Sequence, residues 1–218
     1  MLSAANKIEL QPEGHIYRVD GVIKPSNTQI LEDQGIIDLD GIPPERLAYK
    51  SALGTAVHYA IHLHETNNLD EASIHPEIAP FFQAYKKFAE VNRFEPRHTE
   101  LALYSQKWNF CTTLDLQGPF MWKGIERESI IELKCTFSMR VANAIQTAGQ
   151  KIAFEETYKK TKIKGRFGLQ LKGTGNYDVH EYKDPRDEQV FLGALICHRF
   201  RMDNNLLKKN GGSNANDR

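Results

Sequence analysis

The residues best suited to chemistry lie in the segment SIIELKCTF, residues 129–137, which places a carboxylate and an amine two positions apart in an apolar run. Because alternate residues of a β-strand point to the same face, Glu132 and Lys134 should project together, away from the apolar residues beside them. Asp115 interrupts an earlier apolar run, FCTTLDLQG, in the same way. A short hairpin between the two runs would bring Asp115 beside Glu132.

Two carboxylates at close range in a partly buried site repel each other unless a cation lies between them. Oxygen ligands suit Mg²⁺ or Mn²⁺, as one or two ions, and Lys134 would add further positive charge. Such a site could polarise a phosphate ester and activate water, which is the chemistry of a phosphodiesterase. A Glu-x-Lys pair by itself is more often the solvated edge of a strand, so both interpretations remain open.

The segments around these residues define the elements that must position them. Helical periodicity predicts four helices, at residues 42–68, 75–94, 138–160 and 184–205. Runs rich in β-branched and aromatic residues predict strands at residues 99–106, 108–118, 120–125, 128–137, 166–173 and 177–183. A hairpin is expected near the N-terminus, where the pair Asp-Gly lies between alternating apolar residues.

These elements predict an α/β fold with a central mixed β-sheet flanked by helices. With 218 residues and 40% hydrophobic content, we expect one core and a single domain over residues 1–205. Within it, the N-terminal hairpin spans 7–26, a helical part spans 42–94, and the sheet with its helices spans 99–203. The polar tail, residues 206–218, is expected to be disordered.

Charge is balanced over the chain, with 28 basic and 28 acidic residues, so a nucleic acid would have to bind at a local patch. One basic run exists, in the segment YKKTKIKGRFGLQLK at residues 158–172. Its candidate phosphate-binding residues are Lys159, Lys160, Lys162, Lys164 and Arg166. The alternative interpretation is an ordinary solvated loop and strand edge.

The cysteine content and the absence of long apolar runs bear on the cofactor and the location of the protein. Three scattered cysteines cannot supply the four thiolates of an iron–sulfur cluster, so none is expected. The sequence shows no signal-peptide pattern and no apolar run long enough to span a bilayer. We therefore expect a cytoplasmic protein with no membrane partner.

Five motifs occur in a characteristic order along the chain: GTAVH, TELALYS, TTLDLQG, IIELK and AIQTAGQ. In this order the chain resembles the RecB-like branch of the PD-(D/E)XK nuclease superfamily, and in layout it is similar to phage and prophage exonucleases. The resemblance covers residues 15–201 and implies a restriction-endonuclease-like core. The matching positions are Gly54, Thr55, His58, Glu100, Asp115, Glu132, Lys134 and Gln146.

The resemblance also implies roles for these residues. Asp115 and Glu132 would be metal ligands, and His58 and Glu100 would be further ligands or hold water. The amine of Lys134 would act as an electrostatic catalyst, and Gln146 would position substrate or water. Two departures from the family pattern stand out: the Pro-Asp of the superfamily is Leu114-Asp115, and a tyrosine often found four positions after the glutamine is Gln150.

The implied activity is that of a Mg²⁺- or Mn²⁺-dependent deoxyribonuclease, most simply an exonuclease on single- or double-stranded DNA with a free end. It would serve phage or prophage recombination, repair or replication in a bacterial or phage-infected cell. Candidate partners are a single-strand annealing or binding protein and further copies of the same chain. The alternative is a non-catalytic DNA-binding or assembly module built on a nuclease scaffold.

Two other interpretations of His58, in the motif GTAVH, have to be considered: a structural core histidine and one member of a zinc-binding pair. A lone histidine on an apolar helix face, such as His58, is more often a hydrogen-bonded core residue than a metal ligand. His58 and His62 are also spaced like a zinc pair, but no glutamate occupies the metalloprotease position between them. A zinc-peptidase interpretation is therefore disfavoured.

Overall fold

The computed structural model describes residues 7–11, 16–136, 139 and 141–206. An N-terminal sheet of three antiparallel strands comes first: β1 (Ile8–Gln11), β2 (Ile16–Val19) and β3 (Val22–Lys24). The turn between β2 and β3 uses Asp20 and Gly21, both with positive φ, as an Asp-Gly hairpin turn requires. The predicted tail lies outside the described residues except for residue 206.

The central sheet has five strands in the order β4-β5-β6-β7-β8. Their bounds are β4 (His98–Ser105), β5 (Phe110–Trp122), β6 (Ile125–Lys134), β7 (Gly165–Leu171) and β8 (Tyr177–Glu181). All neighbours are antiparallel except β6 and β7, which are parallel because helix α4 (Val141–Thr157) crosses over between them. The predicted α/β fold with a mixed sheet is confirmed.

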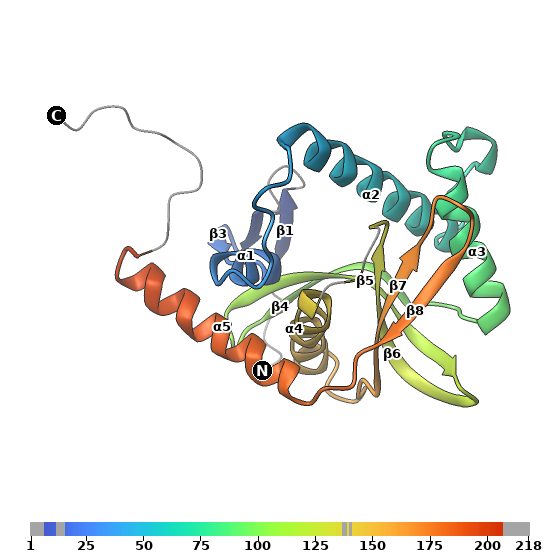
Figure 1. The fold of residues 1–218 in the computed structure, drawn as a ribbon. Coiled ribbons are helices and arrows are strands. Elements are labelled where there is room, and N and C mark those ends of the chain that lie inside the picture. Colours follow the sequence, from blue (N-terminus) through green and yellow to red (C-terminus); the bar gives the residue numbers. More distant parts are fainter. Residues whose placement is uncertain (1–6, 12–15, 137–138, 140, 207–218) are drawn as a thin grey trace.

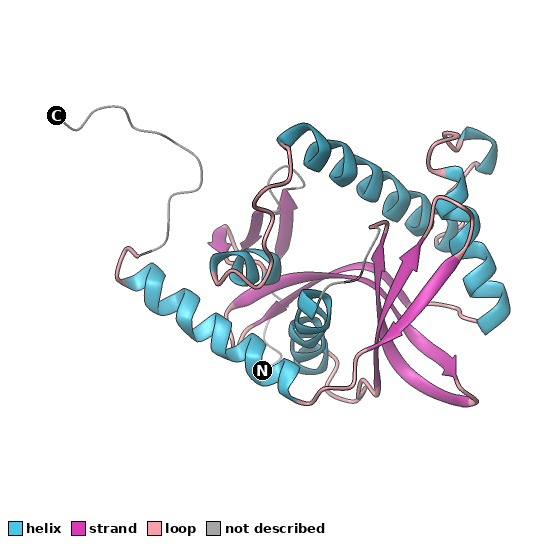
Figure 2. Cartoon of the chain, viewed as in Figure 1, coloured by secondary structure: helices cyan, strands magenta, loops and turns pink. Residues whose placement is uncertain are grey.

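Helices cover both faces of this sheet (Figures 1 and 2). On one face, α2 (Pro44–Glu65) and α3 (Ala79–Asn92) form a core with β5, β6 and β7. On the other, α1 (Asn27–Asp33), α4 and α5 (Arg186–Asp203) pack on β4, β5 and β6. A 3₁₀ turn (Glu71–Ser73) links α2 to α3. Among the described residues, no helix has the length and apolar character that crossing a bilayer requires.

Strands β5 and β6 are paired at one end and separated at the other. The ladder runs from Trp122 opposite Ile125 up to Leu116 opposite Ile131, and it stops there. Beyond this point Asp115 on β5 and Glu132 on β6 face an opening between the strands. We call residues 116–122 with 125–131 the paired end, and residues 110–115 with 132–134 the open end.

Other parts of the chain supply the hydrogen bonds that β6 no longer makes at the open end. The Cys111 amide donates to the Pro25 carbonyl at 2.9 Å, which places the segment before α1 beside β5. The Asn27 side chain then reaches Thr112 and the backbone of α4. At the open end β5 is still paired with β4 and β6 with β7, but side chains and a crossing segment take the place of the β5–β6 ladder.

Two details differ from the sequence-based expectation. Helix α1 was not predicted, although Ser26 and Gln29 form a capping box at its start, a signal readable as S-x-x-Q. The runs 108–118 and 120–125 were predicted as separate strands, but β5 continues through Gly118 and Pro119. A proline is tolerated there because β4 pairs with β5 only as far as Gln117, which leaves that side of β5 without a paired strand.

Candidate metal centre and cleft

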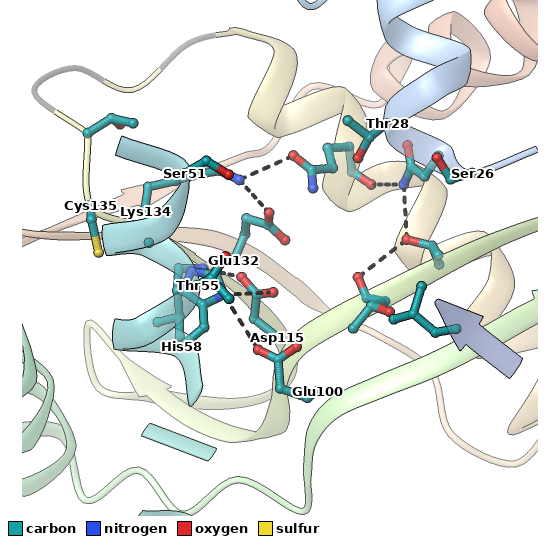
Figure 3. A pocket seen from close by; sticks show the side chains of 18 of the residues that line it. Ser26, Thr28, Ser51, Thr55, His58, Glu100, Asp115, Glu132, Lys134 and Cys135 are labelled. Atoms are coloured by element: carbon teal, nitrogen blue, oxygen red, sulfur yellow. Dashed lines mark hydrogen bonds and ion pairs between the residues drawn. The ribbon is translucent and has the colours of Figure 1, made fainter. Parts of the chain in front are cut away.

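A cleft of about 340 Å³ opens where β5 and β6 separate (Figure 3). Helix α2 forms one wall through residues 50–58, and the N-terminal sheet and the start of α1 form another. The strands β4, β5 and β6 and the first turns of α4 contribute the rest. The paired end of β5 and β6 contributes no lining residue.

Three side chains from three different elements meet in this cleft and could hold a metal ion. They are His58 of α2, Glu100 of β4 and Asp115 of β5, with ligand atoms within 4.8 Å of one another. The Nδ1 atom of His58 lies 3.4 Å from Glu100 Oε1 and 3.5 Å from Asp115 Oδ1. One imidazole nitrogen thus lies between two carboxylates, where a cation would also be attracted.

The backbone of Glu100 is unusual. Its φ is +48°, in the left-handed region, and the β4–β5 ladder skips it, pairing Thr99 with Leu116 and then Leu101 with Leu114. A non-glycine residue in this region costs on the order of 1 kcal/mol and is retained where the surroundings require it. In this conformation the Glu100 carboxylate lies close to His58 and Asp115.

The carboxylate of Asp115 is almost wholly buried, with 7% of the residue exposed. Burial, and next the charge of Glu132, raise its pKa from 3.8 to about 8. Its Oδ2 also accepts the Leu133 amide at 2.7 Å, which ties Asp115 to β6 across the opening. A buried carboxylate beside other carboxylates is stabilised as an anion only when positive charge is close.

Burial disfavours the charged form of His58, but the Asp115 charge and the hydrogen bond with Glu100 outweigh it and raise the His58 pKa to about 9. The imidazole is therefore protonated at neutral pH. Its proton supplies the positive charge between the carboxylates in the metal-free protein. A metal ion at this position would displace that proton.

Glu132 and Lys134 lie on one face of β6, as the alternation predicts. Lys134 Nζ donates to Glu132 Oε1 at 2.6 Å and to Gln146 Oε1 of α4 at 3.4 Å. Burial lowers the Lys134 pKa, but the charges of Glu132 and Asp115 outweigh it and raise the pKa above its ordinary value, so the amine stays charged. All three predicted residues border the cleft.

Glu132 differs from the other predicted metal ligands because it is outside the cluster of His58, Glu100 and Asp115. Only 2% of Glu132 is exposed, and both of its carboxylate oxygens already accept hydrogen bonds. An oxygen that accepts one hydrogen bond retains a second lone pair, so these bonds orient the carboxylate without preventing it from binding a cation.

Gln150 is the residue that sequence reasoning passed over. It is fully buried on α4, and its Nε2 donates to Glu132 Oε2 at 2.6 Å and to the Thr113 carbonyl at 3.0 Å. One amide group therefore joins β5 to β6 across the opening. The only sequence signal was that a glutamine stands where the family often has tyrosine.

The predicted basic run lies at the far end of α4. From Gln146 the helix extends about 16 Å before it ends at Thr157, at about 1.5 Å per residue, and the run follows. Lys162 is paired there with Glu155. The lysines of this run remain candidates for DNA contact, but they do not border the cleft.

The prediction that Arg166 binds DNA phosphate is wrong. Its guanidinium is buried and donates to the Asp187 carboxylate at 2.7 Å and to the Ala144 carbonyl at 2.6 Å. These bonds join β7 to α4 and α5. Arg166 is therefore a structural residue of the core, and its charge is not available to DNA.

The structure also argues against a zinc site formed by His58 and His62. Nδ1 of His62 is 2.6 Å from the Thr99 hydroxyl, and His62 is not part of the cluster around Asp115. The metal-binding group within the described residues contains one histidine and two carboxylates. This donor set does not match a zinc peptidase with two histidines on one helix.

Comparison with known proteins assigns the chain to no family. No protein-family description matches the chain, and no curated protein matches it. Among solved structures it is similar to the crystal structure of a candidate exonuclease from Eubacterium rectale. The two are 13% identical, with a TM-score of 0.42, over 72% of this chain and 69% of that one. The functional conclusion therefore depends on the residues of this chain.

Proposed function

We propose that the protein is a metal-dependent nuclease that hydrolyses DNA phosphodiester bonds, as the resemblance to the RecB-like PD-(D/E)XK branch implies. One observation carries the proposal: His58, Glu100 and Asp115 converge from separate elements in the cleft that Lys134 also borders. A structural ion pair needs no such excess of carboxylates, and a phosphodiesterase does.

The donor set fits a hard divalent cation. Two carboxylates and one imidazole suit Mn²⁺ well, and Mg²⁺ would be held through the carboxylates and water. A bound ion would polarise a phosphoryl oxygen and lower the pKa of a coordinated water. Glu132 is positioned next to this set as a further ligand, with its carboxylate held by Lys134 and Gln150.

The remaining chemistry belongs to the side chains of β6 and α4. The Lys134 ammonium is held by Glu132 and Gln146 and faces the cleft, where it would stabilise the negative charge that develops on the phosphate in the transition state. The Gln146 amide would orient the attacking water or a phosphate oxygen. Both groups are placed before substrate arrives, so little reorganisation is required during the reaction.

The finer features follow from the resemblance and remain proposals. They are exonuclease action at a free DNA end, a role in phage or prophage recombination, repair or replication, a single-strand annealing or binding protein as partner, and assembly of identical chains. The competing proposal is a non-catalytic DNA-binding module, which would retain the fold without turnover.

A single assay tests the function. The protein is incubated with linear and circular DNA, single- and double-stranded, in Mg²⁺, Mn²⁺ or chelator, beside the Asp115→Asn variant. We expect cleavage that needs metal and is lost in the variant. Degradation of linear but not circular DNA would support an exonuclease. If the parent cuts none of these substrates in any metal but binds them, the non-catalytic module is the correct description.

A further inference from the structure

The two halves of α2 differ in their packing. All four buried residues of this helix, Leu53, Val57, Ala60 and Ile61, follow its first nine residues. Residues 44–52 contain no buried side chain, and this part of the helix extends beside the cleft with little packing beyond the Tyr49 hydroxyl, which donates to Glu77. Figure 1 shows it between the N-terminal sheet and α3. A helical segment with no buried side chain gains little stability from its position.

The side of α2 that faces the cleft carries groups suited to phosphate. Lys50, Ser51, Gly54 and Thr55 line the cleft one to two turns before His58. An ammonium and two hydroxyls all donate hydrogen bonds to phosphate oxygens. They lead along one face of the helix toward the candidate metal centre, as the positions of Ser51, Thr55 and His58 in Figure 3 show.

No close packing among the described residues requires glycine at position 54 of α2. A Cβ built at Gly149 of α4 would lie 2.7 Å from Phe191 and from Asn27, so close packing requires that glycine. A Cβ at Gly54 would meet nothing within 4 Å. A glycine inside a helix destabilises it relative to alanine. The open space beside Gly54 is on the cleft side, where a ligand backbone could approach the helix closely.

We propose that this face of α2, made of Lys50, Ser51, Gly54 and Thr55, is the surface on which the DNA backbone reaches the metal centre, with a phosphate seated against Gly54. The inference rests on the proposed function and deepens it. A cleft of about 340 Å³ is at the lower limit of ligand pockets. Because duplex DNA is far wider, with a major groove alone of about 12 Å, the segment bound here is a single strand.

This surface replaces the basic run as the principal DNA contact. Lys159 and Lys160 follow the far end of α4, whereas Lys50 lines the same cleft as Lys134. A strand that follows α2 passes the candidate metal ligands directly. The two surfaces make opposite predictions for charge reversal, so one set of variants distinguishes them.

The first measurement is binding of a fluorescent single-stranded oligonucleotide in chelator, in the Asp115→Asn background, as a function of salt. Lys50→Glu should weaken binding roughly tenfold and reduce the slope of log affinity against log salt by about 0.7. Lys123→Glu, a charge reversal at the β5–β6 turn, is the matched control and should change neither. Loss of binding in Lys159→Glu/Lys160→Glu with none in Lys50→Glu would overturn the proposal in favour of the basic run.

The second measurement uses Gly54→Ala and Gly54→Gln. Both replace glycine with a better helix former, so the melting temperature should rise by about 2 °C. Binding and cleavage should nevertheless fall, and more for glutamine, because its side chain fills the space of the phosphate. Greater stability with lower affinity cannot result from misfolding. Unchanged affinity in both variants would overturn the role of Gly54.

Failure of this inference is distinguishable from failure of the proposed function. If Asp115→Asn abolishes cleavage while the Lys50 and Gly54 variants bind and cut at the parental level, the nuclease site stands and the α2 surface is wrong. If Asp115→Asn cuts at the parental rate, the metal centre itself is wrong. Tighter binding of blunt duplex than of single strand by the parent would overturn the single-strand assignment.

Discussion

The two ends of the β5–β6 pair use the same chemical pairing for different purposes. At the paired end, Gln117 donates to Glu128 at 3.0 Å, and Arg97 binds the same carboxylate. At the open end, Gln150 donates to Glu132 at 2.6 Å, and Lys134 binds that carboxylate. Each glutamate therefore has one amide donor and one cation.

The difference lies in the charges around each pair. The Glu128 charge is balanced by Arg97. At the open end, Glu132 is joined by Asp115 and Glu100, so three carboxylates face Lys134 and the histidine of α2. A buried excess of negative charge is costly unless a proton or a metal ion neutralises it. The Gln–Glu–cation arrangement is therefore structural at the paired end, whereas at the open end it borders a candidate ion-binding site.

The largest expected effect comes from Asp115→Asn, which keeps the shape of the side chain and removes its charge. Cleavage should fall by roughly three orders of magnitude or more, because a metal ligand and its charge are lost. DNA binding should persist. The control is Glu126→Gln, an exposed acid at the paired end, which should cut DNA at the parental rate. Equal rates for Asp115→Asn and parent would show that the open end is not the site.

Lys134→Gln should cause the second-largest loss of activity. Removing the ammonium takes away stabilisation of the transition state, so turnover should fall by about a hundredfold or more, while Mn²⁺ affinity measured by calorimetry remains. Lys123→Gln, at the turn of the paired end, is the matched control and should be active. Loss of Mn²⁺ binding in Lys134→Gln would instead assign the lysine a role in holding the ligands.

Gln150→Leu and Gln117→Leu compare the two amide donors directly. Removing the Gln150 amide leaves Glu132 held by Lys134 alone and breaks the link to Thr113 of β5, and loss of such an outer hydrogen bond typically costs about 10- to 100-fold in metal affinity or activity. Removing Gln117 should lower the free energy of unfolding by roughly 1 kcal/mol with normal metal affinity, because Arg97 still binds Glu128. If both variants lose only stability, Gln150 has no functional role.

The smallest expected effect is on stability as a function of pH. The folded state raises the pKa of Asp115 from 3.8 to about 8 and that of His58 from 6.5 to about 9. Because the two groups are in contact, they titrate as a pair, and the folded pair holds protons that the unfolded chain releases, so the metal-free protein should lose stability as pH rises from about 4 to 9. Melting temperatures in chelator should fall by a few degrees across this range.

Two comparisons sharpen the pH experiment. Mn²⁺ should raise the melting temperature more at pH 8.5 than at pH 6, because metal binding displaces the same protons. The pH dependence should become flatter in Asp115→Asn, since that position no longer titrates. A melting temperature that rises with pH in chelator would contradict the assignment of protonated groups at the open end.

Several features of the site could be predicted because they depend on local sequence. Strand alternation alone places Glu132 and Lys134 on one face, and the short hairpin brings Asp115 close enough to β6 to accept the Leu133 amide and to feel the Glu132 charge. Helix α2 begins with Pro44 at its first turn, as its sequence indicated. These inferences needed only the period of a strand and the starting signal of a helix.

Other features could not be predicted, because they depend on contacts between distant segments. The basic residue Arg166 reads as a DNA contact until Asp187 and Ala144, far along the chain, are seen to bury it. The twisted backbone at Glu100 has no signature in the residue types around it. The missed helix α1 is short, and its capping box was its single local signal.

The sequence by itself determined which groups are present and which of them share a strand or helix face, since side-chain direction follows from the backbone period. Only the tertiary structure decided that β5 and β6 separate at Asp115, that Gln150 crosses the opening, and that His58 and Glu100 approach Asp115. The physical reason is that burial, charge neutralisation and hydrogen-bond satisfaction are properties of the assembled core. They are set by segments far apart in the chain, such as Pro25 beside Cys111 of β5 and Asn27 beside Gln146 of α4, which are 86 and 119 residues apart.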